Sequence, residues 1–317
     1  MKTRLVKKVH AKLFILGMLG LLLGAASGET DCLISTNAAS VENNHAGAKT
    51  SASKRGHPME SSQIEAMILA KEWKVLDYIG ALGESAIPML SRLLENPDPQ
   101  VRQLVVLCLE KVPGPKAADL LAKTINDPDE QVRAYAADIL LVTPDPSILP
   151  AMLSAATRHE DPYIRAKAAL FVGIMGDGNS LDLLRQALAS EQNANVQNGL
   201  QQAMARLGDP AARRAILEQL NSPDKKKQFE ALEKIEYVND RNLVKNISRL
   251  LDNSSPVMVL MASETARVVL RLKDAAAKVI AVLLKQPFTF KLPSYRVCTD
   301  AEIQEIKAYL QKQRLVD

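Results

Sequence analysis

Asp98-Pro99-Gln100-Val101-Arg102 recurs twice along this chain, as Asp129-Glu130-Gln131-Val132-Arg133 and as Asp161-Pro162-Tyr163-Ile164-Arg165. Three weaker copies begin further along, at Asn193, Ser222 and Ser255. The starts of the six copies lie 31, 32, 32, 29 and 33 residues apart. Self-similarity at a fixed period of about 20 to 50 residues is typical of proteins that stack one small structural unit many times. The spacing therefore predicts a repeat protein.

Each copy starts with a residue that favours the position before a helix. Asp, Asn and Ser side chains accept hydrogen bonds from the free N–H groups of a first helical turn, and Pro is the second residue in four of the six copies. Apolar residues then recur at helical spacing, as in Val101, Val105, Cys108 and Val112. Gly and Pro residues interrupt this pattern before a second apolar helix, at 113–115, 144–146, 176–178 and 208–210. One unit is therefore predicted to be a helix, a tight turn and a second helix.

Such a hairpin is too small to bury both of its helices, whereas stacked neighbours share a continuous core. We therefore predict an all-α fold, a right-handed α–α superhelix of about seven helical hairpins over residues 61–285. Its first helix begins at a capping box, Ser62 to Glu65, and runs to about Leu82. Residues 286–317 are predicted to be a C-terminal capping segment, with a final helix that starts at Thr299-Asp300-Ala301-Glu302 and ends near Lys312.

The Asp-Pro-x-Val-Arg starts, the alanine pairs at 136–137 and 168–169 and the Gly-Asp turns resemble HEAT repeats. They are most similar to the short HEAT-like repeats first associated with bilin lyases. The resemblance covers about residues 62–285 and implies an α-solenoid. It leaves the function open, because this fold serves many roles.

The first 28 residues are predicted to be a signal peptide. Basic residues precede an apolar run of 14 residues, Leu13 to Ala26, and Ala26-Ser27-Gly28 offers small residues for cleavage. The run is shorter than the about 20 residues that cross a bilayer, so no membrane span is expected after cleavage; an uncleaved anchor is the alternative. Residues 29–60 are rich in Ser, Ala, Asn, Gly and Lys and are predicted to be a disordered linker. We therefore expect an exported protein, periplasmic or secreted.

Export changes the charge balance of the chain. The whole chain has 40 Lys and Arg against 36 Asp and Glu, and the signal peptide takes five basic residues, which leaves 35 against 36. A nearly neutral mature chain lacks the positive charge of a general nucleic-acid binder, so no nucleic-acid partner is predicted. Among the cysteines, Cys108 is expected to be an inert buried thiol, while Cys32 and Cys298 lie outside the repeats and could pair in an oxidising compartment.

Arginine occupies the fifth position of the three strongest copies. HEAT-like proteins stack such arginines against the acidic cap of a neighbouring repeat, and the guanidinium fork suits two carboxylate oxygens. We therefore predict a structural ladder of Asp98, Arg102, Asp129, Arg133, Asp161 and Arg165. An anion-binding stripe is the alternative interpretation.

Polar residues early in the same helices are predicted to line one face of the solenoid. Amide and tyrosine side chains suit adaptable recognition of an extended polypeptide. The candidate partner-binding face consists of Gln100, Gln103, Gln131, Tyr135, Tyr163, Lys167, Asn195 and Asn198. The alternative is that these are ordinary polar residues facing solvent.

No catalytic residue, metal ligand or cofactor is predicted. The chain has no Gly-x-Ser-x-Gly, no His beside a Cys and no glycine-rich phosphate loop. His159-Glu160 resembles the iron-binding pairs of HEAT-like deoxyhypusine hydroxylases, but it is a single pair and is expected to be a solvated loop. Acidic neighbours offset the basic run Lys225 to Lys227.

These observations favour an exported, non-enzymatic HEAT-repeat scaffold that binds a protein partner in the cell envelope. One alternative is a bilin-lyase-like or other ligand-handling protein, although bilin attachment is cytosolic. Another is a structural component associated with peptidoglycan.

Overall fold

The computed structural model describes residues 59–261 and 267–316. The predicted signal peptide and most of the predicted linker lie outside these residues. The described residues form two compact units, 59–203 (unit 1) and 204–316 (unit 2), and one helix runs across the division.

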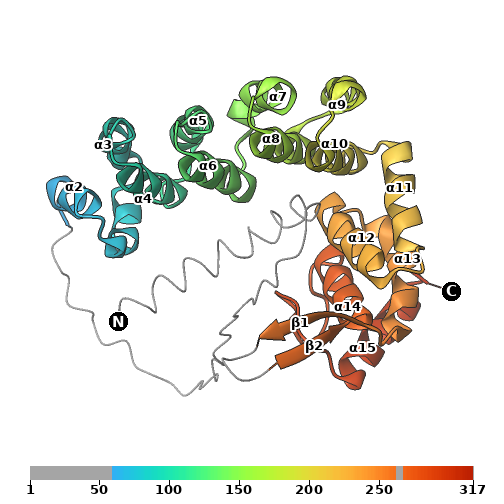
Figure 1. Cartoon of the computed structure of the whole chain (residues 1–317). Helices are drawn as coiled ribbons and strands as arrows, with labels where there is room; N and C mark the ends of the chain where they lie inside the picture. Colours follow the sequence, from blue (N-terminus) through green and yellow to red (C-terminus); the bar gives the residue numbers. More distant parts are fainter. Residues whose placement is uncertain (1–58, 262–266, 317) are drawn as a thin grey trace, which may run out of the picture. The chain divides into compact units, whose positions relative to one another are not determined.

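Unit 1 is built from helices in two layers. Figure 1 shows α3, α5, α7 and α9 in one layer and α4, α6, α8 and α10 in the other. The helices are α2 (Ser61–Leu69), α3 (Ile87–Leu93), α4 (Pro99–Glu110), α5 (Pro115–Thr124), α6 (Glu130–Val142), α7 (Leu149–Arg158), α8 (Pro162–Met175), α9 (Gly178–Ser190) and α10 (Ala194–Arg206). The predicted unit of two helices per repeat is confirmed, and the layer of α4, α6, α8 and α10 holds the copies of the repeated sequence.

The caps of this layer form as predicted. The side chains of Asp98, Asp129 and Asp161 accept backbone N–H groups at 2.9, 3.0 and 2.9 Å. Asn193 does the same at the start of α10, at 3.0 Å. Each bond satisfies a donor that the first turn leaves free, and this fixes where the helix begins.

The layer packs closely because small residues meet where helices cross. A Cβ on Gly199 of α10 would lie 3.1 Å from the carbonyl oxygen of Ala166 in α8. Ala136, Ala137, Ala168 and Ala169 are all fully buried, together with Phe171. The core of unit 1 is therefore a continuous apolar layer between the two rows of helices.

The N-terminal end differs from the prediction. We expected one helix as far as Leu82, whereas α2 ends at Leu69 and two 3-10 segments follow, η1 (Trp73–Asp77) and η2 (Ile79–Ala86). Lys71 has a φ of 55° and Gly83 a φ of 52°, which no α-helix accommodates. The glycines at 80 and 83 weaken the helix that the apolar spacing favours.

Unit 2 begins as another helical hairpin and then departs from the pattern. Its helices are α11 (Pro210–Leu220), α12 (Lys225–Val238), α13 (Val244–Ser248), α14 (Leu272–Leu283) and α15 (Asp300–Lys312), with 3-10 segments η4 (Arg241–Leu243) and η5 (Arg249–Asp252) beside α13. Two antiparallel strands, β1 (Pro256–Met261) and β2 (Arg267–Arg271), stand between α13 and α14 and pair Val259 with Val269. The final helix ends at Lys312 as predicted.

The strands correct the prediction for the sixth copy of the repeat. Ser255 was expected to begin a helix, but the residues after it are β1. Uninterrupted apolar residues, Val257 to Met261, and the valine pair of β2 favour extended backbone over a helix with one apolar face. The all-α solenoid is otherwise confirmed. Taken as predicted, with the capped helix first, five helix pairs lie in the described residues: α4/α5, α6/α7, α8/α9, α10/α11 and α12/α13.

The segment between α14 and α15 is fastened by side chains. The Gln286 amide bonds both backbone groups of Leu292, at 3.1 and 3.0 Å, and Glu305 accepts the backbone N–H and the hydroxyl of Thr289. The backbone N–H of Cys298 donates to Asp274 Oδ1 at 3.0 Å, and its carbonyl oxygen accepts from Arg271 Nη2 at 2.8 Å. None of the helices in the described part of the chain is long and apolar enough to cross a bilayer.

Candidate functional site

The repeated arginines of unit 1 join successive repeats through nearly identical bonds. Arg102 donates from Nε and Nη2 to the two oxygens of Asp127, both at 2.8 Å, and from Nη1 to the carbonyl oxygens of Asn96 and Pro97. Both side chains are more than nine-tenths buried. Because the hydrogen bond to Asp127 favours the charged form, the pKa of Arg102 is raised. The guanidinium therefore ties a loop to its own helix and to the next repeat.

The other two arginines repeat this arrangement. Arg133 donates to Asp161 Oδ2 at 3.1 and 3.0 Å, and Arg165 donates to the two oxygens of Glu191 at 2.8 and 3.1 Å. In each case Nη1 bonds the carbonyl oxygens five and six residues before the arginine. The arginine also lowers the pKa of Glu191 through these hydrogen bonds.

The acids that receive the arginines are mostly different from the predicted ones. Only Arg133 reaches the cap of the next repeat, Asp161; Arg102 reaches Asp127 instead of Asp129, and Asp98 is bonded by Lys71 Nζ at 2.5 Å. The Lys71 hydrogen bond lowers the pKa of Asp98. The prediction of cap aspartates as the partners is therefore wrong for Asp98 and Asp129.

A side chain two residues before the cap explains the difference. In five successive loops this side chain accepts the backbone N–H of the cap residue, and the five are Asn96, Asp127, His159, Glu191 and Ser222. Where this side chain is acidic, as in Asp127 and Glu191, it also accepts hydrogen bonds from the arginine of the preceding repeat. His159 carries no negative charge, so Arg133 bonds the cap Asp161 itself. The prediction that Ser222 is itself the cap of its helix is wrong, because Asp224 caps α12.

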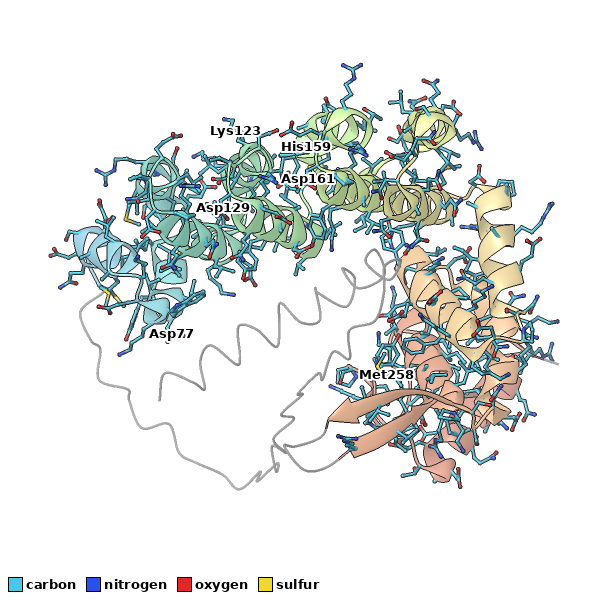
Figure 2. All side chains as sticks on the ribbon, in the orientation of Figure 1. Asp77, Lys123, Asp129, His159, Asp161 and Met258 are labelled. Atoms are coloured by element: carbon cyan, nitrogen blue, oxygen red, sulfur yellow. The ribbon has the colours of Figure 1, made fainter. Side chains whose placement is uncertain are left out.

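His159 lies in a loop, as predicted, but its ring is half-buried and both of its nitrogens are bonded. Its Nδ1 accepts the Asp161 N–H at 3.0 Å, so Nε2 carries the proton and donates to the carbonyl oxygen of Ile125 at 3.1 Å. Figure 2 shows His159 and Asp161 together at the junction of α7 and α8. Both ring nitrogens have structural partners within unit 1.

A shallow polar hollow of about 510 Å³ adjoins this loop. Its lining is Asn126, Asp127, Pro128, Arg133, Arg158, His159 and Glu160. The Arg133 and His159 groups in it are already occupied by loop carbonyls and Asp161. Within the residues that the structure describes, no group of three or more His, Cys, Asp and Glu could hold a metal ion.

The candidate partner-binding face lies on α4, α6, α8 and α10. Gln100 and Gln131 are exposed, and Gln103, Tyr135, Tyr163, Asn195 and Asn198 are half-buried. Gln103 Nε2 donates to Gln131 Oε1 at 3.1 Å across the first two helices, and Gln100 Oε1 accepts from Lys71 at 3.3 Å. These seven residues are called the amide-rich face below.

Lys167 does not belong to this face. It is fully buried, with Nζ 2.8 Å from Asp138 Oδ1 and 5.0 Å from the centre of the Tyr163 ring. The Tyr163 hydroxyl donates to the same Asp138 oxygen at 2.9 Å, and burial raises the pKa of Tyr163. In α8 the sixth residue after the cap lies in the contact with α6, so the Lys167 side chain faces the neighbouring helix and not solvent.

The two described cysteines are both free and buried. Burial raises the pKa of Cys108 to about 12 and that of Cys298 to about 11. Thiolates are the reactive form, so neither sulfur is activated. Cys32, the predicted partner of Cys298, lies outside the described residues.

Comparisons with known proteins agree with the two-layer architecture. A family model for HEAT repeats matches residues 71–129 and 118–205. A search of curated proteins found no match.

Solved structures that resemble the chain do so at low identity. One is a chain of the complex of CpcE and CpcF of phycocyanin lyase from Nostoc sp. PCC7120, with 15% identity, a TM-score of 0.44, and 84% of this chain and 99% of that chain covered. Human deoxyhypusine hydroxylase in complex with glycerol has 14% identity and a TM-score of 0.32, over 80% and 94% of the two chains. An engineered protein has 15% identity and a TM-score of 0.24, over 81% and 92%.

These structural likenesses are too weak to speak for activity or partners. The family match rests on the sequence of the repeats, and the helices, caps and buried alanines that it covers are those of the two-layer array. Residues 71–205 of the chain are HEAT repeats.

Proposed function

We propose that this protein is an exported, non-enzymatic scaffold that holds an extended segment of a protein partner on the amide-rich face. The observation that carries the proposal is the placing of amide and tyrosine side chains at the same position of consecutive repeat helices. Two residues after the cap stand Gln100, Gln131, Tyr163 and Asn195.

The chemistry of these side chains fits a polypeptide. An amide both donates and accepts hydrogen bonds, as a peptide group does, so amides one repeat apart can bond the backbone of an extended chain. Five residues after the cap stand Gln103, Ala134 and Asn198, which carry no charge either, whereas Ala166, at the same position of α8, is fully buried. The face therefore favours a segment with few charged residues.

The loops before these helices are held by hydrogen bonds, which is expected to lower the cost of binding. Arg102 and Arg165 each make four hydrogen bonds to loop carbonyls and acids. Association loses less conformational entropy when the binding groups are already held in place. The arginine ladder thus acts as the frame of the face.

The expected location rests on the N-terminal sequence. A basic stretch, an apolar run and small residues precede the repeats, in the order of a signal peptide. The scaffold is accordingly placed in the periplasm or outside the cell, where a mature chain of balanced charge would bind its partner through hydrogen bonds and packing.

Binding of envelope proteins by variants tests the proposal. Gln131→Glu together with Asn195→Asp keeps side-chain size but puts negative charge on the face, and we expect at least one cross-linked partner to be lost. Gln186→Glu is the matched control, because Gln186 is exposed on α9 in the other layer. Equal cross-linking by both variants would refute the amide-rich face as the binding site.

A further inference from the structure

The hairpin of β1 and β2 in unit 2 is apolar but poorly covered. β1 consists of Pro256 followed by apolar residues alone, and it contains no ionisable side chain. Of the apolar side chains that the structure describes in the two strands, only that of Leu270 is buried. Val259 and Val269, which pair directly across the hairpin, are 54% and 49% exposed. Figure 1 shows the two strands side by side at the edge of unit 2.

The two faces of this hairpin differ. Residues that pair directly across two antiparallel strands share a face, and successive residues alternate between the faces. Leu270, opposite Met258, is fully buried and marks the inner face, which packs on the helices of unit 2. Val259 and Val269 accordingly mark the outer face, and their exposure shows that no described residue covers it.

The outer edge of β1 is open. The sheet has two strands in the described residues, so every second residue of β1 presents its N–H and C=O groups away from β2. These outward groups make no hydrogen bond within the described part of the chain. A row of unpaired N–H and C=O groups is a template for one further extended strand. The chemistry of the edge therefore specifies a strand as its occupant.

The sequence of β1 is complementary to itself. An antiparallel pairing of β1 with a second β1, centred on Val259, sets uncharged apolar residues opposite one another throughout. The opposed residues are Val257 with Met261, Met258 with Leu260, and Val259 with its own copy. Pro256, which has no N–H to donate, lies outside these pairs.

The sequence of β2 is not complementary to itself. The same pairing of two β2 strands, centred on Val269, would set Arg267 opposite Arg271 of the other copy. Like charges that lie directly opposite each other destabilise a sheet, and charged residues are a common protection of strand edges. Charge thus favours the edge of β1 for pairing between two copies of this chain.

We propose that β1 is a self-association edge, at which two copies of the chain join by antiparallel pairing of their β1 strands about a two-fold axis at Val259. The product is a four-stranded sheet of order β2–β1–β1–β2, in which the same surface serves both copies. The open backbone groups of β1 become paired, and the exposed valines of both copies lie on one face of the sheet. The two β2 strands, which carry the arginines, are about 14 Å apart at a strand spacing of about 4.8 Å. This contact belongs to unit 2 and does not depend on the amide-rich face.

Cysteine cross-linking in the purified full chain tests this geometry. At the two-fold axis Val259 lies about 5 Å from its own copy, within disulfide reach, so Val259→Cys is expected to form a covalent dimer under mild oxidation. Val269→Cys is the matched control, because this valine is similarly exposed on the same face but would lie about 14 Å from its copy. Both variants are made in a Cys32→Ser background, since Cys108 and Cys298 are buried. Non-reducing electrophoresis should show dimer formation at least about tenfold faster for Val259→Cys than for Val269→Cys.

Sedimentation velocity measures the association without a cross-link. The pairing is short, so the dimer is expected to have a dissociation constant in the micromolar range or weaker, and its fraction should rise with protein concentration. Val259→Lys should abolish this rise, because two ammonium groups would face each other at the axis. Leu183→Lys, at an exposed apolar position of α9, should keep it.

Three results would overturn the proposal. Equal cross-linking of the two cysteine variants would mean that the hairpins meet through their faces or by collision, and faster cross-linking of Val269→Cys would place the contact at β2. A chain that sediments as a monomer up to near-millimolar concentration would leave the edge of β1 to a strand of another protein. Should Val259→Cys fold poorly by circular dichroism, sedimentation of the unmodified chain decides: a dimer that forms with rising concentration supports the proposal, and a monomer rejects it.

Discussion

Lys167 and Lys278 have similar partners in the two units. Each ammonium lies beside a carboxylate of the preceding repeat helix, Asp138 or Glu236, and over the ring of a tyrosine. A buried ion pair adds little stability over an apolar pair of the same size, because both charges lose their hydration. Loss of one member alone is costly, since the other charge remains buried.

For Lys167 this asymmetry predicts a large effect. Lys167→Met leaves Asp138 without its ion pair and is expected to lower the free energy of unfolding by about 3 to 5 kcal/mol in urea. Lys123→Met is the control, because Lys123 forms an exposed pair with Asp119, and the expected change is within about 0.5 kcal/mol. Adding Asp138→Leu to Lys167→Met should recover most of the loss. Equal effects of the two lysine variants would contradict a structural role for the buried pair.

The Tyr295 hydroxyl gives the opposite prediction. It is buried and has no hydrogen-bond partner among the described residues, so Tyr295→Phe removes an uncompensated polar group and keeps the ring against Phe229. We expect the free energy of unfolding to rise by about 1 kcal/mol. Thermal denaturation at pH 6 measures this, and a clear loss of stability would show that the hydroxyl has a partner in solution.

The loop before each repeat helix contains a hydrogen bond at a recurring position that its sequence does not reveal. The repeat starts, Gly and Pro breaks and apolar spacing were enough to predict the helices from α4 to α10 and the caps of α4, α6, α8 and α10. The residue two before each cap was missed, because Asn96, Asp127, His159, Glu191 and Ser222 share only an acceptor atom and not a residue type. A search for acceptors at this position would have found it.

The same loop explains why the sixth copy was mistaken for a helix. Asn253 accepts the N–H of Ser255 at 3.0 Å, so the local turn of the repeat is present although a strand follows it. Local turn chemistry does not decide what comes next; the continuous apolar run of β1 does. The buried position of Lys167 could not be predicted for a related reason, since the contact between α6 and α8 depends on how closely the helices approach.

Variants at His159 test the loop rule. His159→Asn keeps an acceptor for the Asp161 N–H, as Asn96 does for Asp98, whereas His159→Leu removes it. Both variants lose the bond to Ile125, so the difference between their free energies of unfolding reports the hydrogen bond to the Asp161 N–H alone. We expect His159→Leu to be less stable than His159→Asn by about 1 kcal/mol. Urea unfolding of the two proteins measures the difference. Equal midpoints would mean that the acceptor two residues before the cap does not contribute.

Across the molecule, carboxyl groups of unit 2 give its stability two opposite pH slopes. Arg296 bonds both oxygens of Glu302, at 3.0 and 2.7 Å, and lowers the pKa of Glu302 to about 2. That contribution is present above pH 4.5 and is lost as pH falls toward 2. Burial raises the pKa of Glu233 from 4.5 to about 7, so the contribution of Glu233 is lost as pH rises from 4.5 through 7. The stability of unit 2 should therefore peak near pH 5. Hydrogen exchange of the α14 amides from pH 3 to pH 8 measures this stability profile. Glu302→Gln should flatten its acidic side and Glu233→Gln its alkaline side. A profile that changes in one direction only would show that one of the two groups does not titrate as its surroundings require.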